Sequence, residues 1–418
     1  MRSRYETLER EQLAVLLPEL LLTGQLIDRS AMAWCISAFG REEMTRIAID
    51  EWTAASPVYT RRMQRALGYE GTDVVTIFKG LQLDIGAPPQ FMDFRYTVHD
   101  ARHGEFHLDH CGALMDVEPL GDKYVTAMCH DIEDPTFDAT AVATNPRARV
   151  RPVHRPPRVP ADRHPHCRWT IAIDDENPSI AVSPGCEELA KSRAASIELS
   201  PIDPADEGRG DYSGPLLSDL VFADFSKSAL VRMADEVCLQ MHLLNLGFVR
   251  AVRSRTDAEQ ARELCVKQLT GIAGIAAQRI AQALGLPANV TGALRVLELH
   301  PLLNPAAYVS ATVTGGVLRS QHPSPAQADG AWISLCGPGE PRPLAAIVRA
   351  VDPHLDVECS PPGAATATGN TKAVWAARVV ARPEAIPECD EVAVTRISTG
   401  SSFAFQPRRS IPLTPLRA

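Results

Sequence analysis

The sequence lacks several features by which a class of protein is often recognised. It has no long block of lysine and arginine, and its formal net charge is −9, so nucleic acid is not expected as a partner. It has no apolar run long enough to span a bilayer, because the apolar residues 13–22 are few and are interrupted by Pro18 and Glu19. We therefore expect no membrane partner.

Close cysteine pairs are also missing. The ten cysteines are spread singly, without a CxxC pair, and nothing at the N-terminus resembles a secretory signal. Both observations favour a reducing environment, so we expect a cytoplasmic protein with free thiols. The chain does have size: 418 residues, of which 45% are hydrophobic, predict a large core shared by two or three domains.

Local patterns predict an α+β fold. Residues 1–84 show a helical spacing of apolar residues, whereas residues 92–98, 105–111 and 167–173 alternate as half-buried strands. A short helix at residues 123–133 is expected to end before Pro135, because the residue preceding a proline is pushed out of the helical conformation.

The second half of the sequence repeats the first. At shifts of 217 or 218 positions, and after one deletion, the matches in chain order are Arg62 with Arg279, Ala66-Leu67-Gly68 with Ala283-Leu284-Gly285, Asp134-Pro135 with Asp352-Pro353, and Trp169 with Trp375. Two unrelated α+β halves are the alternative, but collinear matches favour a duplication. We expect two homologous halves, each with helices on a small antiparallel sheet: residues 1–175, a linker at 176–218, a degenerate copy at 219–405 and a tail at 406–418.

Histidine and cysteine are concentrated in one stretch of the first half. Residues 99–167, one sixth of the chain, hold eight of the twelve histidines and three of the ten cysteines. Thiol, imidazole, carboxylate and guanidinium groups together are typical of a metal or nucleophile site. The second half lacks the set: His110 and Cys111 fall on Ala328 and Asp329, and Cys129 and His130 fall on Ile347 and Val348. We therefore expect the first half to carry the site.

Three cysteine-containing segments carry a resemblance to a known family. They are His107-Leu108-Asp109-His110-Cys111 on a strand, Cys129-His130-Asp131-Ile132-Glu133 on a helix, and His166-Cys167-Arg168-Trp169 on a later strand. Their order after a helical N-terminal part resembles the L-2-amino-thiazoline-4-carboxylic acid hydrolase family, over about residues 35–175. The tandem second half and the Pro- and Arg-rich segment 145–165 depart from that family's pattern. The resemblance implies hydrolysis of a carbon–nitrogen bond in a cyclic amidine.

The residues would support such chemistry through an activated thiol. Strand alternation places Cys111 and His107 on one face, where they could form a thiolate–imidazolium pair, although Cys111 could equally be a small buried hydrophobe. The candidate catalytic residues are Cys111, Cys129, His107, His110, His130 and Glu133. Candidate substrate-binding residues, chosen because arginine pairs with carboxylates, are Arg149, Arg151, His154 and His166.

A metal is the rival chemistry. Cys111, Cys129 and Cys167 with His110 would give a Cys₃His ligand set for zinc or iron, although the gaps between these cysteines are longer than in most zinc sites. Otherwise no cofactor is expected. The first hypothesis is a C–N hydrolase acting on a small-molecule substrate; the alternatives are a non-catalytic metal- or ligand-binding protein using the same residues, and a scaffold that binds another protein. Assembly into a homo-oligomer stays open.

Overall fold

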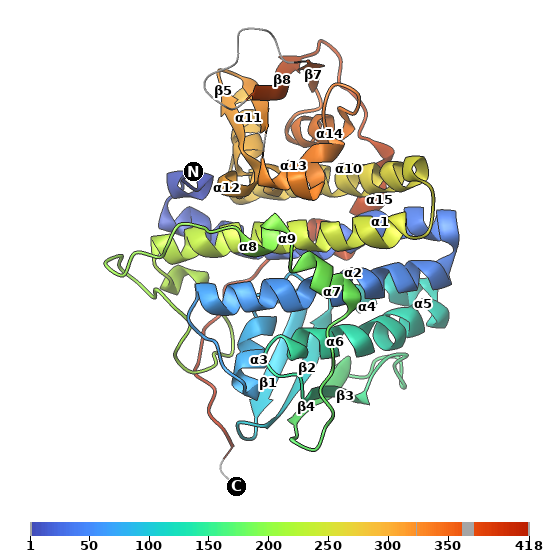
Figure 1. The fold of residues 1–418 in the computed structure, drawn as a ribbon, viewed down its shortest axis with the longest axis vertical. Coiled ribbons are helices and arrows are strands. Elements are labelled where there is room, and N and C mark those ends of the chain that lie inside the picture. Colours follow the sequence, from blue (N-terminus) through green and yellow to red (C-terminus); the bar gives the residue numbers. More distant parts are fainter. Residues whose placement is uncertain (1, 323, 362–371, 417–418) are drawn as a thin grey trace.

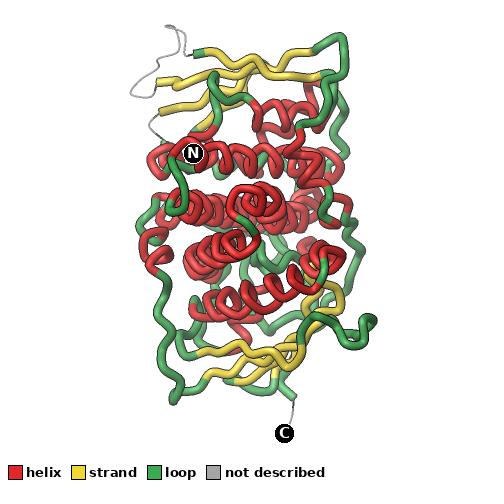
Figure 2. Tube along the Cα trace, turned by 90° about the vertical axis from the view of Figure 1, so that its right-hand side faces the viewer, coloured by secondary structure: helices red, strands yellow, loops and turns green. Residues whose placement is uncertain are grey.

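Two four-stranded antiparallel sheets lie at opposite ends of the molecule, with layers of helices between them (Figures 1 and 2). The computed structural model describes residues 2–322, 324–361 and 372–416, so the last two residues of the expected tail lie outside it. Helices and sheets are both present in each half, which confirms the predicted α+β class with two similar halves.

The elements of the two halves follow a similar order along the chain, with helices, two strands, further helices, two more strands and a helical end in each, although the number of helices differs. The first half contains α1 (Arg10–Phe39), α2 (Arg41–Ala66), α3 (Val74–Leu81), β1 (Met92–Val98), β2 (His103–Cys111), α4 (Gly112–Val117), α5 (Asp122–Thr126), α6 (Glu133–Val142), β3 (Ala148–His154), β4 (Cys167–Ile173), α7 (Pro184–Leu189) and α8 (Arg193–Ser196). The second half contains α9 (Lys227–Arg253), α10 (Ala258–Ala283), α11 (Val290–Leu299), α12 (Ala306–Val309), β5 (Ala311–Thr314), β6 (Val317–His322), α13 (Pro325–Asp329), α14 (Arg342–Val351), β7 (Leu355–Ser360), β8 (Lys372–Ala381) and α15 (Asp390–Arg396).

The strand orders also agree between the halves. They are β1-β2-β4-β3 in the first sheet and β5-β6-β8-β7 in the second, with every neighbouring pair antiparallel. Trp169 on β4 and Trp375 on β8 are both buried, on strands that occupy the same place in the two orders. A shared order of four strands is what a duplicated gene would produce.

The long helices of the two halves pack reciprocally. Helix α2 packs on α9, and α1 packs on α10. Two buried ion pairs cross this interface: Arg62 Nε lies 2.9 Å from Glu236 Oε2, and Arg279 Nη2 lies 2.5 Å from Glu19 Oε2. The two arginines are 217 positions apart in the sequence, and so are the two glutamates. Each half therefore presents the same surface patch to the other, as in a twofold-symmetric dimer.

Local sequence explains where the long helices begin. The side chains of Ser226 and Asp257 accept hydrogen bonds from backbone N–H groups in the first turns of α9 and α10, while Glu9 and Gln12 form a capping box at α1. The apolar residues that predicted the first helix are buried between the two halves: Leu13, Leu16, Leu17, Leu20 and Leu21.

The expected helix end before Pro135 is wrong. Helical structure continues from α5 through a π-helical segment (Ala127–Ile132) into α6, which contains Pro135 in its first turn. In this segment the backbone N–H of Glu133 reaches the carbonyl of Met128, five residues earlier. The wider turn ahead of Pro135 accommodates a residue that lacks an N–H group and would clash in a regular helix.

Asp134-Pro135 and Asp352-Pro353 match in the sequence but do not occupy equivalent places in the structure. Helices α6 and α14 occupy corresponding places before β3 and β7, and both are ten residues long. Asp134 lies in the first turn of α6, whereas Asp352 follows the last residue of α14. The shift of 217 positions therefore holds for α1 and α2 but not for this later part of the repeat.

Candidate functional site

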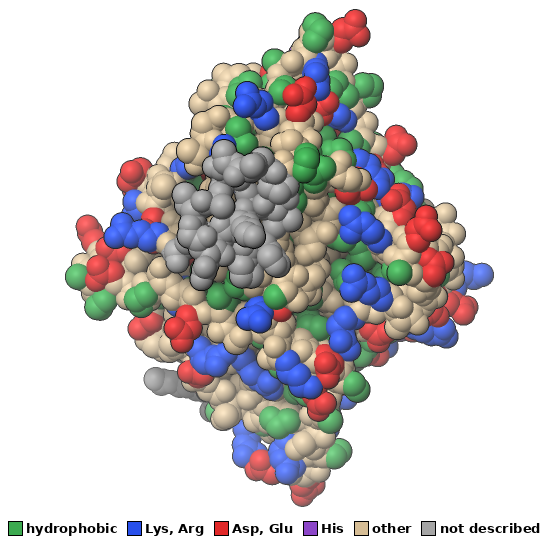
Figure 3. Space-filling model, turned by 45° about the horizontal axis from the view of Figure 1, so that its top comes forward, with side chains coloured by type: hydrophobic (Ala, Val, Ile, Leu, Met, Phe, Trp, Pro, Cys, Tyr) green, Lys and Arg blue, Asp and Glu red, His purple; other side chains and the backbone are tan. Residues whose placement is uncertain are grey.

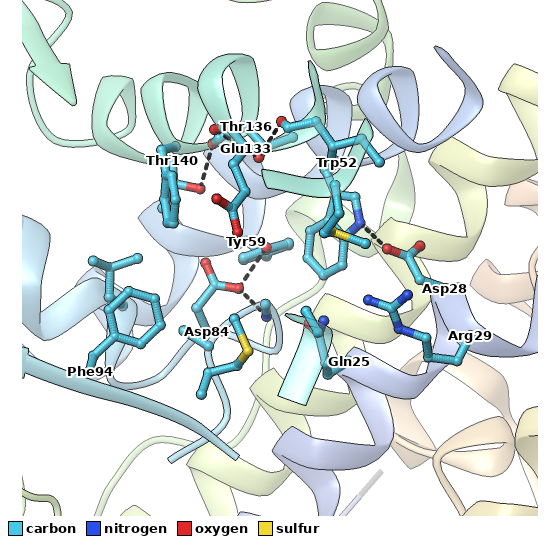
Figure 4. Close-up of a pocket in the computed structure, with 18 residues that line it drawn as sticks. Gln25, Asp28, Arg29, Trp52, Tyr59, Asp84, Phe94, Glu133, Thr136 and Thr140 are labelled. Carbon is cyan, nitrogen blue, oxygen red and sulfur yellow. Dashed lines mark hydrogen bonds between the residues drawn. The ribbon is translucent and has the colours of Figure 1, made fainter. Parts of the chain in front are cut away.

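A cavity in the first half, enclosed by α1, α2, α6, β1 and the loop after α3, brings buried carboxyl groups together with an arginine (Figure 4). We call it the acidic cavity. It leaves about 80 Å³ for the centres of water-sized molecules, several times what one water needs. Its polar lining residues are Gln25, Asp28, Arg29, Tyr59, Asp84, Glu133, Thr136 and Thr140, and its apolar lining includes Trp52, Met92, Phe94, Met128 and Phe137.

Asp84 is fixed at the floor of the cavity by two donors. The Tyr59 hydroxyl donates to Asp84 Oδ1 at 2.8 Å, and the backbone N–H of Gly86 donates to the same oxygen at 2.7 Å. Burial raises the pKa of Asp84 to about 6, and these hydrogen bonds oppose the rise because they stabilise the charged form. Asp84 is therefore mostly ionised at neutral pH.

The second half holds the loop that carries Asp84. Gln240 of α9 accepts a hydrogen bond from the backbone N–H of Ile85 at 3.0 Å and donates to the carbonyl of Leu83 at 2.8 Å. Ile85 also lies against Gly24, where an added Cβ would come within 2.5 Å of the isoleucine side chain. The position of Asp84 thus depends on both halves of the chain.

Glu133 faces Asp84 across the cavity (Figure 4). Its Oε2 atom is buried and has no hydrogen-bond partner within the described part of the chain. Burial raises the pKa of Glu133 to about 8, although the positive charge of Arg155 opposes the rise. Glu133 is therefore mostly protonated at neutral pH. It directly follows the π-helical segment, a local irregularity that often marks functional sites.

Arg29 supplies a positive charge to the same cavity. Its guanidinium lies 3.5 Å from the carboxylate of Asp116, and its Nη1 atom lies 2.9 Å from the sulfur of Met32. Its Nη2 atom is buried and, among the described residues, has no acceptor. The cavity therefore presents a free cationic donor on one side and two carboxyl groups on the other.

The three predicted cysteines come together, but in the core and not at the cavity surface. All of them are buried, and burial together with the nearby Glu133 raises the pKa of each thiol, to about 12 for Cys111. The predicted face for Cys111 is wrong, because a bulge between β1 and β2 pairs Cys111 with Met92 and Leu108 with Phe94. The extra residue turns Cys111 inward, so the structure does not support an activated thiolate.

The predicted histidines lie outside the acidic cavity. His107 Nε2 lies 3.3 Å from Asp109 Oδ1 on the outer face of the sheet. The rings of His110 and His130 are held by the backbone carbonyls of Phe91 and Pro156, at 2.9 and 2.7 Å. Of the six residues predicted to be catalytic, only Glu133 lines the cavity.

The predicted substrate-binding residues also lie elsewhere. Arg149 and Arg151 line a separate groove beside Pro135, where Arg151 pairs with Asp138 at 2.9 Å and Arg149 donates to the carbonyl of Ala148. Burial lowers the pKa of His154 and of His166, and neither lines the acidic cavity.

The predicted metal ligands do not form a ligand set. Within residues 2–322, 324–361 and 372–416, no group of three or more histidine, cysteine, aspartate or glutamate side chains is arranged to hold a metal ion. The predicted ligands Cys111, Cys129, Cys167 and His110 are therefore not arranged as a metal site.

The second half lacks the charges that α1 contributes to the acidic cavity. At the shift of 217 positions that relates α1 to α9 and α2 to α10, the cavity residues Asp28, Arg29, Trp52 and Tyr59 fall on Asn245, Leu246, Leu269 and Ala276. This difference between the halves concerns residues other than those predicted from the sequence to be catalytic. The sequence did contain a signal for these positions: at the constant shift, an acid of the first half falls on an amide in the second half, and other polar residues fall on apolar ones.

Comparison of the chain with family models, curated proteins and solved structures found no match. None of the helices in the described part of the chain has the length and apolar character needed to cross a membrane. Figure 3 shows one face of the molecule, on which acidic and basic side chains are interspersed with uncharged surface.

The burial of the thiols predicts their reactivity. The buried thiols Cys111, Cys129 and Cys167 should resist a thiol reagent in native protein at about pH 7.5 to 8.5, which is up to the pKa of an ordinary thiol. The half-buried Cys359 and Cys389 should react first. Mass spectrometry of the labelled peptides measures this, and unfolded protein, in which all ten thiols should react, is the control. Rapid labelling of Cys111 in native protein would contradict the buried position described here.

Proposed function

We propose that the first half is a small-molecule hydrolase that cleaves a carbon–nitrogen bond in a cyclic amidine, with Asp84 and Glu133 as its acid–base pair. The observation that carries this proposal is that two buried carboxyl groups face each other in one cavity with pKa values of about 6 and about 8. Between these values one group is a base and the other an acid, which is the arrangement that acid–base catalysis requires.

The cavity suits a small zwitterion. The Asp84 carboxylate offers a counter-ion to an amidinium group, and the aromatic rings of Trp52 and Phe94 offer faces on which a planar cation can lie. The free Nη2 atom of Arg29 offers a donor to a carboxylate on the same molecule. The resemblance to the L-2-amino-thiazoline-4-carboxylic acid hydrolase family, whose substrate is such a molecule, agrees with this assignment.

The proposed reaction uses one water molecule. Asp84 accepts a proton from the water as its oxygen bonds to the amidine carbon, and Glu133 gives its proton to the ring nitrogen as the carbon–nitrogen bond breaks. The second proton of the water passes to the released amine as the carbonyl forms, so the product is ring-opened, and the step leaves Asp84 protonated and Glu133 ionised. Binding without turnover, at the same cavity, is the second candidate, because the same charges would hold the ligand.

Asp84→Asn tests the proposal. The asparagine oxygen keeps an acceptor for Tyr59 but is no base, so turnover of 2-aminothiazoline-4-carboxylate should fall by about 100-fold or more. Wild-type turnover should follow a bell-shaped pH profile with limbs near 6 and 8, set by Asp84 and Glu133. Chromatography with mass detection measures the product from this substrate and from a panel of cyclic amidines.

Glu187→Gln is the matched control, because Glu187 is an exposed glutamate far from the cavity lining. Calorimetric titration of the same compounds separates the two candidates. Binding that Asp84→Asn weakens, without any turnover by the wild type, would leave the binding protein as the function. Equal turnover by wild type and Asp84→Asn would contradict the assignment of the site.

A further inference from the structure

A second pair of carboxyl groups lies in the wall of the acidic cavity. Asp28 of α1 and Glu51 of α2 are both buried, and they lie side by side: both line one small cavity, and each influences the pKa of the other. Two ionised carboxylates side by side in a buried place would repel each other and lose their hydration, so the pair is expected to keep one proton. Trp52 Nε1 donates to Asp28 Oδ2 at 2.5 Å, which fixes the Asp28 side of the pair.

The second half contains a neutral version of this pair. At the shift of 217 positions, Asp28 falls on Asn245 and Glu51 falls on Gln268, and Asn245 Nδ2 donates to Gln268 Oε1 at 2.9 Å. The amide pair joins α9 to α10 as the acid pair joins α1 to α2. The fold therefore needs only a hydrogen bond at this place. An exchangeable proton is what the first half has and the second half lacks.

The acid pair also separates two cavities. Asp28 lines the acidic cavity, and both Asp28 and Glu51 line a smaller, mainly apolar cavity behind it, together with Cys35, Met44 and Phe248. The ionisable groups that interact with the pair are Arg29 and Cys35 from α1, Tyr59 from α2 and Cys265 from α10. Only Arg29 among them is a cation, so the pair is held beside one positive charge in an otherwise buried setting.

We propose that Asp28 and Glu51 form a proton store that resets the acid–base pair of the acidic cavity after each turnover. This inference rests on the proposed function. Each turnover leaves a proton on Asp84 and removes one from Glu133. The store gives its proton to Glu133 and recovers one from Asp84, through solvent in the cavity, so protons balance over the cycle. Asp28 and Glu51 act through the other two residues and are therefore positioning residues.

The first arm of the test needs no substrate. In Glu133→Gln protein, whose cavity glutamate cannot carry a proton, infrared spectra at pH 7 should still contain the carbonyl band of a protonated carboxylic acid. That band should lose the intensity of one carboxylic acid in the triple variant Glu133→Gln, Asp28→Asn, Glu51→Gln, while other buried acids such as Asp235, whose pKa burial raises to about 7, keep their contribution. Absence of the band from Glu133→Gln protein, or an unchanged intensity in the triple variant, would overturn the store. Neither result depends on whether the protein is a hydrolase.

The second arm concerns turnover. The double variant Asp28→Asn, Glu51→Gln reproduces the amide pair of the second half, so it should fold with an unfolding temperature at least as high as that of the wild type. Its kcat should fall about 10-fold with KM nearly unchanged, and the alkaline limb of its pH profile should move. An unchanged pH profile would show that the pair only joins α1 to α2. If the wild type turned over none of the compounds tested, the proposed function would be refuted. The infrared result would still show whether Asp28 and Glu51 hold a proton.

Discussion

Glu133→Gln is expected to stabilise the protein above pH 8 and to have little effect on stability below pH 4 (about half a unit under the ordinary glutamate value). The folded chain holds the Glu133 proton until about pH 8, whereas an unfolded chain releases it near the ordinary value of 4.5. Between these values the unfolded state binds fewer protons, so the stability of the wild type falls as the pH rises. Glutamine carries no charge and abolishes this loss, a gain of up to about 5 kcal/mol at alkaline pH.

Thermal unfolding of both proteins, followed by circular dichroism at acidic, neutral and alkaline pH, measures this difference. Glu187→Gln, at an exposed position, should follow the wild type at every pH. A Glu133→Gln variant that is destabilised equally at all three pH values would mean that the glutamate is held by a structural partner and is not a buried acid.

The sequence correctly predicted those parts of the fold that follow from the periodic spacing of apolar residues. The alternation of residues 92–98 and 167–173 became β1 and β4, and the matching of Arg62 with Arg279 identified the true shift between the long helices. It failed where one residue changes the local geometry. The π-helical segment before Pro135 and the bulge that turns Cys111 inward both depend on tertiary packing, which periodicity does not contain.

The cysteines and histidines selected from the sequence do not line the acidic cavity, and the physical reason is a different one. Density of histidine and cysteine was taken to indicate chemistry, but His107 lies on the outer face of a sheet and Cys167 fills its inner face. Reactivity depends on burial and on neighbouring charge, which residue type alone does not give. The informative residues were the acids Asp28 and Glu51, because each falls on its own amide in the second half.

Removal of Arg279 should destabilise the protein by about 3 kcal/mol or more, because Arg279→Met leaves Glu19 facing its former partner's place inside the interface. Arg279 also donates to the carbonyls of Gly400, Ser401 and Phe403, and each of these would lose its donor. Burial already raises the pKa of Glu19, and Arg279 opposes that rise, so the loss should be greatest at high pH, where Glu19 is charged. Chemical denaturation at one acidic and one alkaline pH measures it.

The pseudo-symmetric Arg62→Met is the matched comparison. Arg62 likewise donates to the backbone carbonyls of Ala195 and Ile197, but its partner Glu236 keeps a second cation, Arg232, whose Nη2 lies 3.0 Å from Glu236 Oε1. Arg62→Met should therefore cost less than Arg279→Met and depend less on pH. Adding Glu19→Gln to Arg279→Met should restore part of the stability, because it removes the unpaired charge but not the unpaired carbonyls. If the two arginine variants lost equal stability and Glu19→Gln restored none, the arginines would act through their carbonyl partners alone, and the reciprocal ion pairs would not be what holds the two halves together.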